Sequence, residues 1–600
     1  MQKYNSRQEV PDKYKWDLTG IYKDISEYNN AFNELKSNID KLSTYVGCTK
    51  DSNKLLEFLD KYIDTISLWE NIYVYAYLIN DQELGNSNSI INKGIAEKLN
   101  MDLEGNTSYF APELLELDEK EYNKLFEDNK DLLKYKFQLD SIYRTKKHVL
   151  TSDEERIVSS LVLSMNHFDD ISSNLINNEH YYGKVKDSDG KVVEIATNNY
   201  RKLMHNKDVN FRKKVYKLFN RKLDEYSSTN ASLLNSYVSM NNEVAKIRHY
   251  KDSWDSRLFE LNLSDKVFKT LVNTTESNLD VLHKYYNLKR RALGLDKLHT
   301  YDLNLDMSNN DREYSIEEAQ DILRDSLKVL GNDYMSHFNK IFDNKYIDYC
   351  QYKGKCSGAY SFSTLDHDSR ILMSFNNELD SISTIAHEGG HNVHHQYVKA
   401  NNDPIYRSPF SIVCEVASLT NECILSDYIY KNGKTINEKK AGLNNIIGVI
   451  ISNLFGAVRE GKLEQDMYKE VFKGNTITKD FMDKKTRNSL KRYYGKEVIT
   501  DKYIKNGWVT RSHYYMHFYL YSYAICISVA SYVASKILNG DKDMLDKYIK
   551  FLKTGSDKWP SEAFSVLGID LEDENVYKEA IKYFDSLLDR FNMLLDKEVE

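Results

Sequence analysis

Apolar residues recur at helical spacing from residue 18 to about residue 175. In the run LLEFLDKY, for example, Leu55, Phe58, Leu59 and Tyr62 follow the i, i+3, i+4, i+7 pattern of a helix with one buried face. Polar clusters such as GNSNS and TSDEE interrupt this pattern at intervals. The first part of the chain is therefore predicted to be a series of helices.

The segment 180–196 has a different pattern. Two short runs, KVK and KVVEI, flank the sequence DSDG, which is typical of a tight turn between two antiparallel strands. We expect a β-hairpin here, at the end of an N-terminal helical lobe that covers residues 1–199. A second, larger domain would then cover residues 200–600.

Helical spacing resumes between residues 200 and 345, and again after Asp380 almost to the end of the chain. The region between them, roughly 350–378, contains CSGAYSF and RILMSFN, which are predicted to be short strands around a polar loop. The predicted fold class is therefore mainly α, with a small β element that directly precedes a histidine-rich helix.

Composition adds constraints on the class of protein. Only 5 Pro and 24 Gly occur in 600 residues, which favours long uninterrupted helices. The formal net charge is −8, and no run of five or six like charges occurs, so neither nucleic acid nor a membrane surface is expected as a partner. Two uncharged stretches, 441–458 and 512–535, are too polar to span a membrane and are expected to be buried helices.

Cysteine usage and the first residues bear on the compartment. The six cysteines are scattered and include no CxxC pair, so they are expected to be reduced thiols. The first twenty residues contain no apolar stretch of the kind found in secretory signals. We therefore expect a cytoplasmic protein.

The most informative motif is HEGGH, from His387 to His391. Two histidines four residues apart on a helix lie on the same face, so both imidazoles can reach one metal ion. Glu388 can then act as a general base toward an attacking water. Such a motif is expected by chance only roughly 0.02 times in a chain of this composition. The two glycines destabilise a helix, which suggests the close approach of another backbone or of substrate.

A catalytic zinc usually has three protein ligands and one open position. The third is expected from a downstream helix, where Glu415 lies on an otherwise apolar face and would be costly to bury without a partner. Glu422, seven residues later on the same face, is either a hydrogen-bond acceptor for a ligating histidine or an ordinary surface carboxylate. His394 is the alternative third ligand, but its rise of about 10 Å from His387 makes an outer position or a core position more suitable.

A second cluster of polar side chains lies in the sequence HYYMHFYLYSYAI, which begins at His513. Tyr519 and Tyr523 are one helical turn apart, and Tyr521 lies between them. Phenol and imidazole groups can donate hydrogen bonds to the negative charge that develops on a carbonyl oxygen during amide hydrolysis. The alternatives are the wall of a catalytic site or an aromatic packing stripe in a chain with 46 Tyr.

Together these motifs resemble oligoendopeptidase F, within the thimet oligopeptidase-like zinc metallopeptidases. The similarity runs through most of the chain and rests on the order and spacing of its motifs: KYKWDLTGIY (13–22), YDLNLDM (301–307), SGAYSF (357–362), HEGGHNVHH (387–395), EVASLTNE (415–422), HYYMHFYLYSYA (513–524) and TGSDKWPSEAFSVLGIDL (554–571).

The resemblance implies a two-lobed helical, zincin-like metallopeptidase with a deep central channel, and residues 200–600 as its catalytic domain. It implies one Zn²⁺ per chain and hydrolysis of internal bonds in short, unstructured peptides. It also implies roles for particular residues: zinc ligands (His387, His391, Glu415), general base (Glu388), contacts to the scissile carbonyl (His513, Tyr523), secondary substrate contacts (Tyr519, Tyr521), and a substrate-pairing edge strand with its loop (Gly358, Ala359, Tyr360). The helix spacing, not the resemblance, places His394 and Glu422 at outer positions around the zinc.

Two departures from the family pattern and two rival functions stay open at this stage. Gly389 replaces a bulkier apolar residue, which would loosen the helix, and His517 replaces a proline and competes with His513 for the carbonyl. A zinc carboxypeptidase or dipeptidyl carboxypeptidase of related fold would need a cation such as Arg511 or Lys502 for the free C-terminus. A non-catalytic peptide-binding relative is the third possibility.

Overall fold

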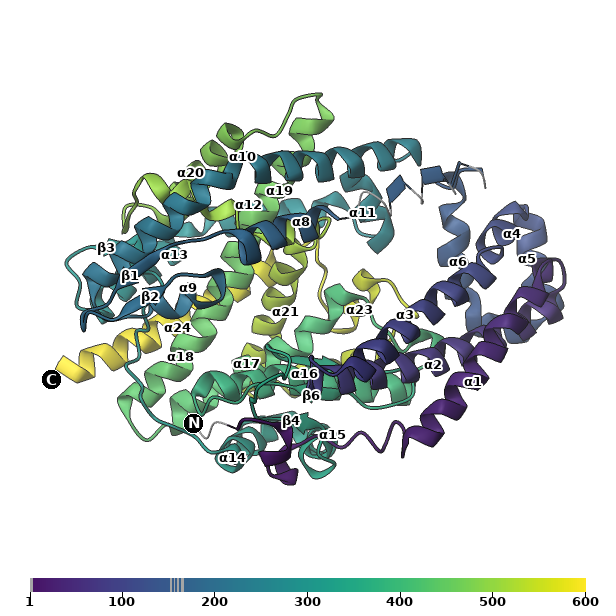
Figure 1. Cartoon of the computed structure of the whole chain (residues 1–600), viewed down its shortest axis with the longest axis horizontal. Helices are drawn as coiled ribbons and strands as arrows, with labels where there is room; N and C mark the ends of the chain where they lie inside the picture. The colour runs from purple at the N-terminus through teal and green to yellow at the C-terminus, as the bar shows by residue number, and fades with distance from the viewer. Residues whose placement is uncertain (1–3, 152–153, 156, 159–160, 163–166, 600) are drawn as a thin grey trace. The chain divides into compact units, whose positions relative to one another are not determined.

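The structure, a computed structural model, is mostly helical and describes residues 4–151, 154–155, 157–158, 161–162 and 167–599 (Figure 1). Its internal contacts divide the chain into two compact units, each assembled from three segments. Unit 1 comprises residues 1–147, 312–425 and 533–568, and unit 2 comprises residues 148–311, 426–532 and 569–600. This division follows spatial contacts, and the sequence-based lobe boundary at 199/200 stays a prediction.

Unit 1 contains the histidine-rich helix and a three-stranded sheet. Its elements are α1 (Ile25–Leu42), α2 (Ser52–Gln82), α3 (Ser87–Thr107), α4 (Phe110–Glu116), α5 (Glu119–Asp128), α6 (Lys136–Tyr143), α14 (Ile316–Leu327), α15 (Gly331–Asp343), β4 (Ile347–Asp348), β5 (Tyr360–Phe362), β6 (Arg370–Leu372), α16 (Leu379–Asn401), α22 (Lys542–Leu552) and α23 (Pro560–Val566).

Unit 2 contains the longest helix and the predicted hairpin. Its elements are α8 (Phe168–Asn174), β1 (Lys184–Lys186), β2 (Val192–Glu194), α9 (Thr197–Met204), α10 (Val209–Ile247), α11 (Ser253–Leu261), α12 (Asp265–Ser277), α13 (Leu279–Ala292), β3 (Leu298–His299), α18 (Ile436–Ile450), α19 (Ala457–Phe472), α20 (Lys479–Tyr494), β7 (Val498–Ile499) and α24 (Asn575–Val599). Two helices, α17 (Ser411–Asn432) and α21 (Leu520–Leu538), contribute residues to both units.

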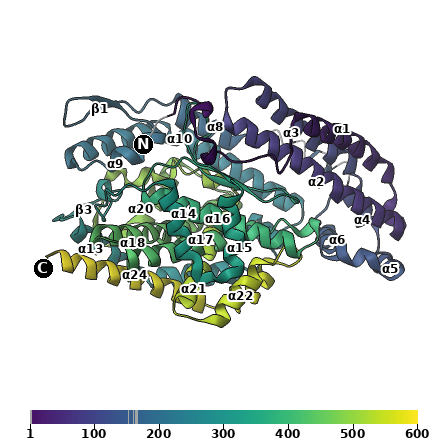
Figure 2. The same ribbon diagram turned by 90° about the horizontal axis from the view of Figure 1, so that it is seen from below.

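The helical prediction for the first part of the chain is confirmed. Asp51 caps α2, because its side chain accepts hydrogen bonds from the backbone N–H groups of Asn53 and Lys54. Leu55, Phe58 and Leu59 are buried in a core that α2 shares with α1 and α3, and the three helices lie side by side in both views (Figures 1 and 2). The apolar stripe read from the sequence is thus the core-facing side of α2.

The predicted β elements are also confirmed. β1 and β2 pair as an antiparallel hairpin, with Val185 opposite Val193. In unit 1 the strand order is β4-β6-β5, in which β6 pairs antiparallel with β5 and parallel with β4. β5 therefore lies at the edge of this sheet. Among the named strands, two parallel pairings were not predicted: that of β4 with β6 and the short contact of β3 with β7.

A buried lysine fixes the segment that leads into β5. The side chain of Lys355 is fully buried, and its Nζ donates to the backbone oxygens of Asp348, Cys350 and Met373 at 2.7 to 3.0 Å. Its ammonium group also lies 2.7 Å from the Asp348 carboxylate. An unpaired buried ammonium group would be strongly unfavourable, so Lys355 must keep its partners close. These four contacts therefore hold the ends of β4 and β6 beside Lys355.

One predicted helix differs from the structure. The stretch 512–535 was expected to be a buried helix, but α21 begins only at Leu520. Ser512 to Tyr515 form a single 3₁₀ turn, and the next residues turn away because His517 and Phe518 have φ values of 28° and 58°. These positive φ angles are incompatible with a right-handed helix, so the prediction was wrong for residues 512–519.

Two helical stretches of the described chain are long and apolar enough to span a membrane by length and composition. They are Ile436–Phe472 and Leu520–Leu538. The most apolar 18-residue stretch of the first is 50% buried inside the protein, and that of the second is 78% buried. Core helices of this kind pass the same test, which makes length and composition weak grounds for a membrane span.

Helices α16 and α17 approach each other backbone to backbone at Gly390. A Cβ atom at this position would lie 2.6 Å from the Cα of Ser418 and 2.8 Å from the carbonyl oxygen of Ala417. The expectation that a glycine in HEGGH permits close approach of another backbone is therefore confirmed for Gly390. Gly389 faces a side chain instead, because a Cβ there would lie 2.7 Å from the ring of the fully buried Phe338.

We predict that Gly390→Ala destabilises the protein by about 1–3 kcal/mol, because the added methyl group must push α16 away from the α17 backbone. Urea or thermal unfolding measures the change. The matched control is Gly448→Ala in α18, where a Cβ atom meets nothing within 4 Å and helix propensity should raise stability slightly. Equal stability of the two variants would show that the packing at Gly390 is not tight.

Candidate metal centre

Three side chains from α16 and α17 converge in unit 1. His387 and His391 project from one face of α16, and their ring centroids are 5.0 Å apart. Glu415 reaches them from α17, and its Oε2 lies 3.4 Å from His387 Nε2 and 3.5 Å from His391 Nε2. The Gly390 contact explains the convergence, because Glu415 lies one helical turn before Ser418.

The geometry of this cluster fits a metal ion. One ligand atom from each of the three residues lies within 4.8 Å of the others. Donor atoms bound at about 2.0–2.2 Å to a tetrahedral zinc lie about 3.3–3.6 Å from one another, which matches the His–Glu separations here. His394 is not part of the cluster; it is buried, and its ring stacks on Phe551. The described residues thus contain a His₂Glu donor set.

A buried carboxylate, that of Glu422, orients His387 through the ring nitrogen that does not face Glu415. Glu422 Oε1 lies 2.7 Å from His387 Nδ1, and Ser383 donates a hydrogen bond of 3.0 Å to Glu422 Oε2. With Nδ1 donating to Glu422, the Nε2 lone pair of His387 is directed toward Glu415 and His391. Ser383 was not singled out from the sequence, although its position one turn before His387 places it on the same helix face.

The pKa shifts follow from this crowding of charge. Burial disfavours protonated His387, but the hydrogen bond to Glu422 and the nearby carboxylates outweigh it and raise the pKa of His387 to about 9. Burial also opposes ionisation of Glu415, yet the hydrogen bond and charge of His391 lower the pKa of Glu415 to about 2. The cluster therefore attracts positive charge, which a bound cation would supply.

Glu388 has a different environment from Glu415. Its side chain is buried, and this burial raises the pKa of Glu388 despite the neighbouring His387 and His391. A carboxylate held close to two histidines and excluded from bulk water is suited to proton transfer. Glu388 and Glu415 are thus two acidic residues of one cluster with opposite shifts of pKa.

The predicted substrate-pairing segment lies in the same unit. Gly358 has a φ of 92°, in the left-handed region, and Ala359 is exposed. Tyr360 begins the edge strand β5, and its hydroxyl donates a hydrogen bond of 3.0 Å to Asp81 of α2. Asp81 was not identified from the sequence, because nothing local indicates which tyrosine it would meet.

The tyrosine-rich cluster belongs to unit 2. His513 and Tyr523 are both half-buried, and their rings are 5.9 Å apart, while Tyr519 lies 5.1 Å from Tyr523. Tyr521 is buried and its ring packs edge-on against Trp254 and Phe268, so its predicted substrate contact gains no support.

One ring nitrogen of His517, the alternative to His513, already has a hydrogen-bond partner within the protein. Nε2 of His517 lies 2.8 Å from Ser253 Oγ, and burial lowers the pKa of His517 to about 4. The side chain is therefore held as a neutral hydrogen-bonded group. This arrangement favours His513 as the histidine that is available to a substrate.

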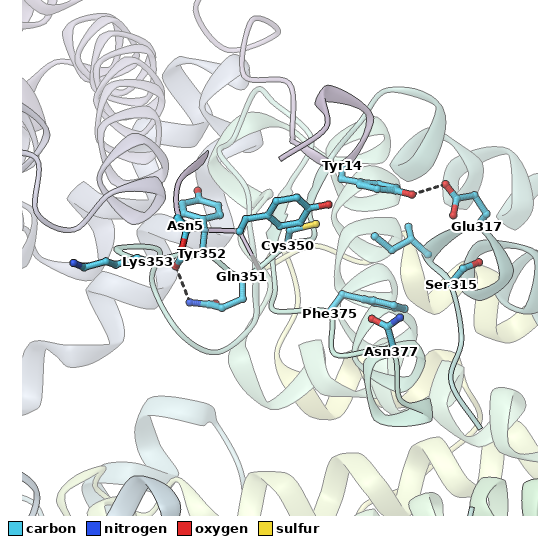
Figure 3. A pocket seen from close by; sticks show the side chains of 12 residues that line it. Asn5, Tyr14, Ser315, Glu317, Cys350, Gln351, Tyr352, Lys353, Phe375 and Asn377 are labelled. Carbon is cyan, nitrogen blue, oxygen red and sulfur yellow. Dashed lines mark hydrogen bonds between the residues drawn. The ribbon is translucent and has the colours of Figure 1, made fainter. Parts of the chain in front are cut away.

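A separate cavity of about 490 Å³ lies in unit 1 (Figure 3). Aromatic and polar side chains line it, among them Tyr14, whose hydroxyl donates a hydrogen bond of 2.8 Å to Glu317. None of the residues of the His₂Glu cluster lines this cavity. It is therefore not part of the candidate metal centre.

Comparison with known proteins agrees with the motif analysis. Residues 202–583 match Peptidase family M3, and residues 113–179 match Oligopeptidase F. The group B oligopeptidase PepB of Streptococcus agalactiae is 27% identical over 596 residues, with 99% of both chains covered. Oligopeptidase PepF of Bacillus subtilis is 28% identical over 599 residues, covering 98% of this chain and 88% of the relative.

A solved structure shows the same relationship. The oligoendopeptidase-F of Enterococcus faecium superposes with a TM-score of 0.74 at 25% sequence identity, covering 95% of this chain and 99% of that chain. The family match extends over more than half of the sequence and includes the HEGGH helix and Glu415. The chain belongs to peptidase family M3 and is a metallopeptidase.

Proposed function

We propose that this protein is a zinc oligoendopeptidase that cleaves internal bonds of short, unstructured peptides. The observation that carries the proposal is the His₂Glu cluster with Glu388 beside it on α16. Support also comes from relatives named oligoendopeptidase F or oligopeptidase, which align over almost the full length of the chain.

His387, His391 and Glu415 would hold the ion, and the mixed nitrogen and oxygen donor set suits zinc. When bound, zinc acts as a Lewis acid that lowers the pKa of water toward about 7 and polarises a carbonyl group. Glu422 would keep His387 in the tautomer that presents Nε2 to the ion. The one His₂Glu cluster among the described residues supports a stoichiometry of one ion per chain.

Glu388 would accept a proton from the attacking water and return it to the leaving amine. His513 and Tyr523 would donate hydrogen bonds to the oxygen of the scissile carbonyl as negative charge develops on it, with Tyr519 as a further substrate contact. The half-buried edge strand β5, with Gly358 and Ala359 before it, would pair with the substrate backbone by strand addition.

The length restriction would come from a deep channel between two lobes, as the family resemblance implies. All six cysteines are free, which agrees with a reducing compartment, and we propose the cytoplasm as the location.

The central test uses an internally quenched peptide of about ten residues that is blocked at both ends. Wild type should cut it at internal bonds, and Glu388→Gln should lower kcat by at least 10²–10⁴-fold while retaining one zinc per chain, since the base is lost and no ligand is removed. Mass spectrometry identifies the products and elemental analysis measures zinc. Cleavage only of unblocked peptides would instead identify a carboxypeptidase.

The role of Glu422 is tested by metal affinity. Glu422→Ala should weaken zinc binding by about 10–100-fold, because His387 loses the acceptor that orients its ring. Competition with a chelator measures the affinity without any assay of activity. Glu422→Gln keeps an acceptor and should lose less. An unchanged affinity in Glu422→Ala would rule out this orienting role.

The role of Tyr523 is tested by kinetics. Tyr523→Phe removes one hydroxyl donor and should lower kcat by about 10²-fold with little change in KM, because the donor acts on charge that develops only in the transition state. Zinc content and unfolding temperature should stay at wild-type values. A wild-type kcat would exclude Tyr523 from the reaction.

A further inference from the structure

The segment that carries His513 ends in a strained turn within unit 2. His517 and Phe518 have consecutive positive φ values of 28° and 58°. A bulky aromatic residue rarely adopts this left-handed conformation, which persists only where surrounding contacts impose it. Strain of this kind occurs often at functional sites.

The turn has a direct structural consequence. In a continuous helix His513 and Tyr523, ten residues apart, would be separated by about 15 Å along the axis. In this structure their rings are only 5.9 Å apart. The turn at residues 517–518 therefore brings the two side chains together.

Helix α19 supplies the groups that hold this segment. Glu460 and Glu464 are buried and lie one helical turn apart. Glu460 accepts a hydrogen bond from the hydroxyl of Tyr514, and Glu464 Oε1 accepts one of 2.6 Å from the backbone N–H of Phe518. Glu464 is fully buried, and its Oε2 has no hydrogen-bond partner among the described residues.

Side-chain packing surrounds the same turn. The Phe518 ring lies 4.3 Å from that of Tyr468 and 4.9 Å from that of Trp254. Tyr237 donates a hydrogen bond of 2.8 Å to the carbonyl oxygen of Tyr515. The Tyr237 hydroxyl also accepts a hydrogen bond of 3.3 Å from the backbone N–H of His517, while Glu464 accepts the one from the backbone N–H of Phe518.

A fully buried carboxyl group with one unpartnered oxygen is costly in a purely structural helix. Burial raises the pKa of Glu464 to about 8, against the opposing effects of the Phe518 N–H and the charge of Arg257. The carboxyl group of Glu464 also interacts electrostatically with the hydroxyl groups of three tyrosines: Tyr237, Tyr468 and Tyr521. At neutral pH the group is mostly neutral, and its oxygen still accepts the N–H of Phe518.

We propose that Glu464 is a positioning residue for peptide hydrolysis, which holds the Phe518 N–H and thereby fixes the turn that places His513 beside Tyr523. The inference rests on the proposed roles of those two side chains. Glu464 itself touches neither substrate nor metal, and it acts through the backbone of residues 513–519.

The test compares variants that differ in their reach to Phe518. Glu464→Gln keeps an acceptor at the same distance and should retain kcat within about threefold, whereas Glu464→Asn is one methylene shorter and should lose about 10–10²-fold, as expected for a misplaced catalytic group. Glu464→Leu should lose as much. The matched control is Asp466→Asn, on the same helix, whose carboxylate pairs with Lys485 instead. KM and zinc content should stay near wild type throughout.

A double-mutant cycle separates this inference from the proposed function. If Glu464 acts by placing His513 and Tyr523, Glu464→Asn should cost much less in a Tyr523→Phe background than in wild type. Additive losses, or equal activities of the Gln and Asn variants, would overturn the positioning role. A Tyr523→Phe variant with wild-type kcat would instead overturn the proposed role of Tyr523.

A pH measurement tests whether Glu464 is buried and titrates at this turn, whereas the double-mutant cycle tests its positioning role. Since the folded-state pKa of Glu464 is about 8 and the ordinary value is 4.5, the folded protein binds more protons between these values, so stability falls as pH rises through this range. The difference in unfolding temperature, wild type minus Glu464→Gln, should therefore decrease as the pH rises from 5 to 9. A constant difference would contradict a buried, titrating Glu464 at this turn.

Discussion

The candidate metal centre depends on one close contact, the approach of α16 to the backbone of α17 at Gly390. Any larger residue would have to displace Ser418, and with it Glu415 one turn earlier on the same helix. The approach allows a carboxylate oxygen from α17 to lie about equally far from two imidazoles on α16. A helix-destabilising residue in the middle of α16 is therefore explained by the geometry that it permits.

Electrostatics then gives the acidic residues of the centre different roles. Burial opposes the ionisation of both Glu415 and Glu388, but the histidines lower the pKa of Glu415, whereas the pKa of Glu388 stays raised. Glu422 is hydrogen-bonded to His387. The opposite pKa shifts of Glu415 and Glu388 suit their proposed roles as ligand and as proton carrier. The bound cation would complete this arrangement by balancing the carboxylates.

Hydrogen bonds donated by tyrosine hydroxyls hold segments together within each unit. Tyr360 is tied to Asp81 in unit 1, and Tyr514 to Glu460 in unit 2. Each pair consists of a tyrosine hydroxyl and a carboxylate from a distant helix, so the pairs link segments that are far apart in sequence. The high tyrosine content is thus partly used for fixing non-helical segments, which helices alone cannot position.

The sequence by itself determined the features that depend on local periodicity and spacing. These include the helices of the first part of the chain, the hairpin around DSDG, the strands of SGAYSF and RILMSFN, and the shared face of His387 and His391. Tertiary structure decided the features that depend on partners from distant elements: the facing backbone at Gly390, the Phe338 ring over Gly389, the hydrogen bond of Ser383 to Glu422, and the buried Glu464 under Phe518. The turn at residues 517–518 belongs to this second group, since local propensity predicted a helix there. Hydrophobic spacing shows that a residue will be buried, but it does not show which neighbour will meet its polar atoms, because that neighbour is set by packing over the whole unit.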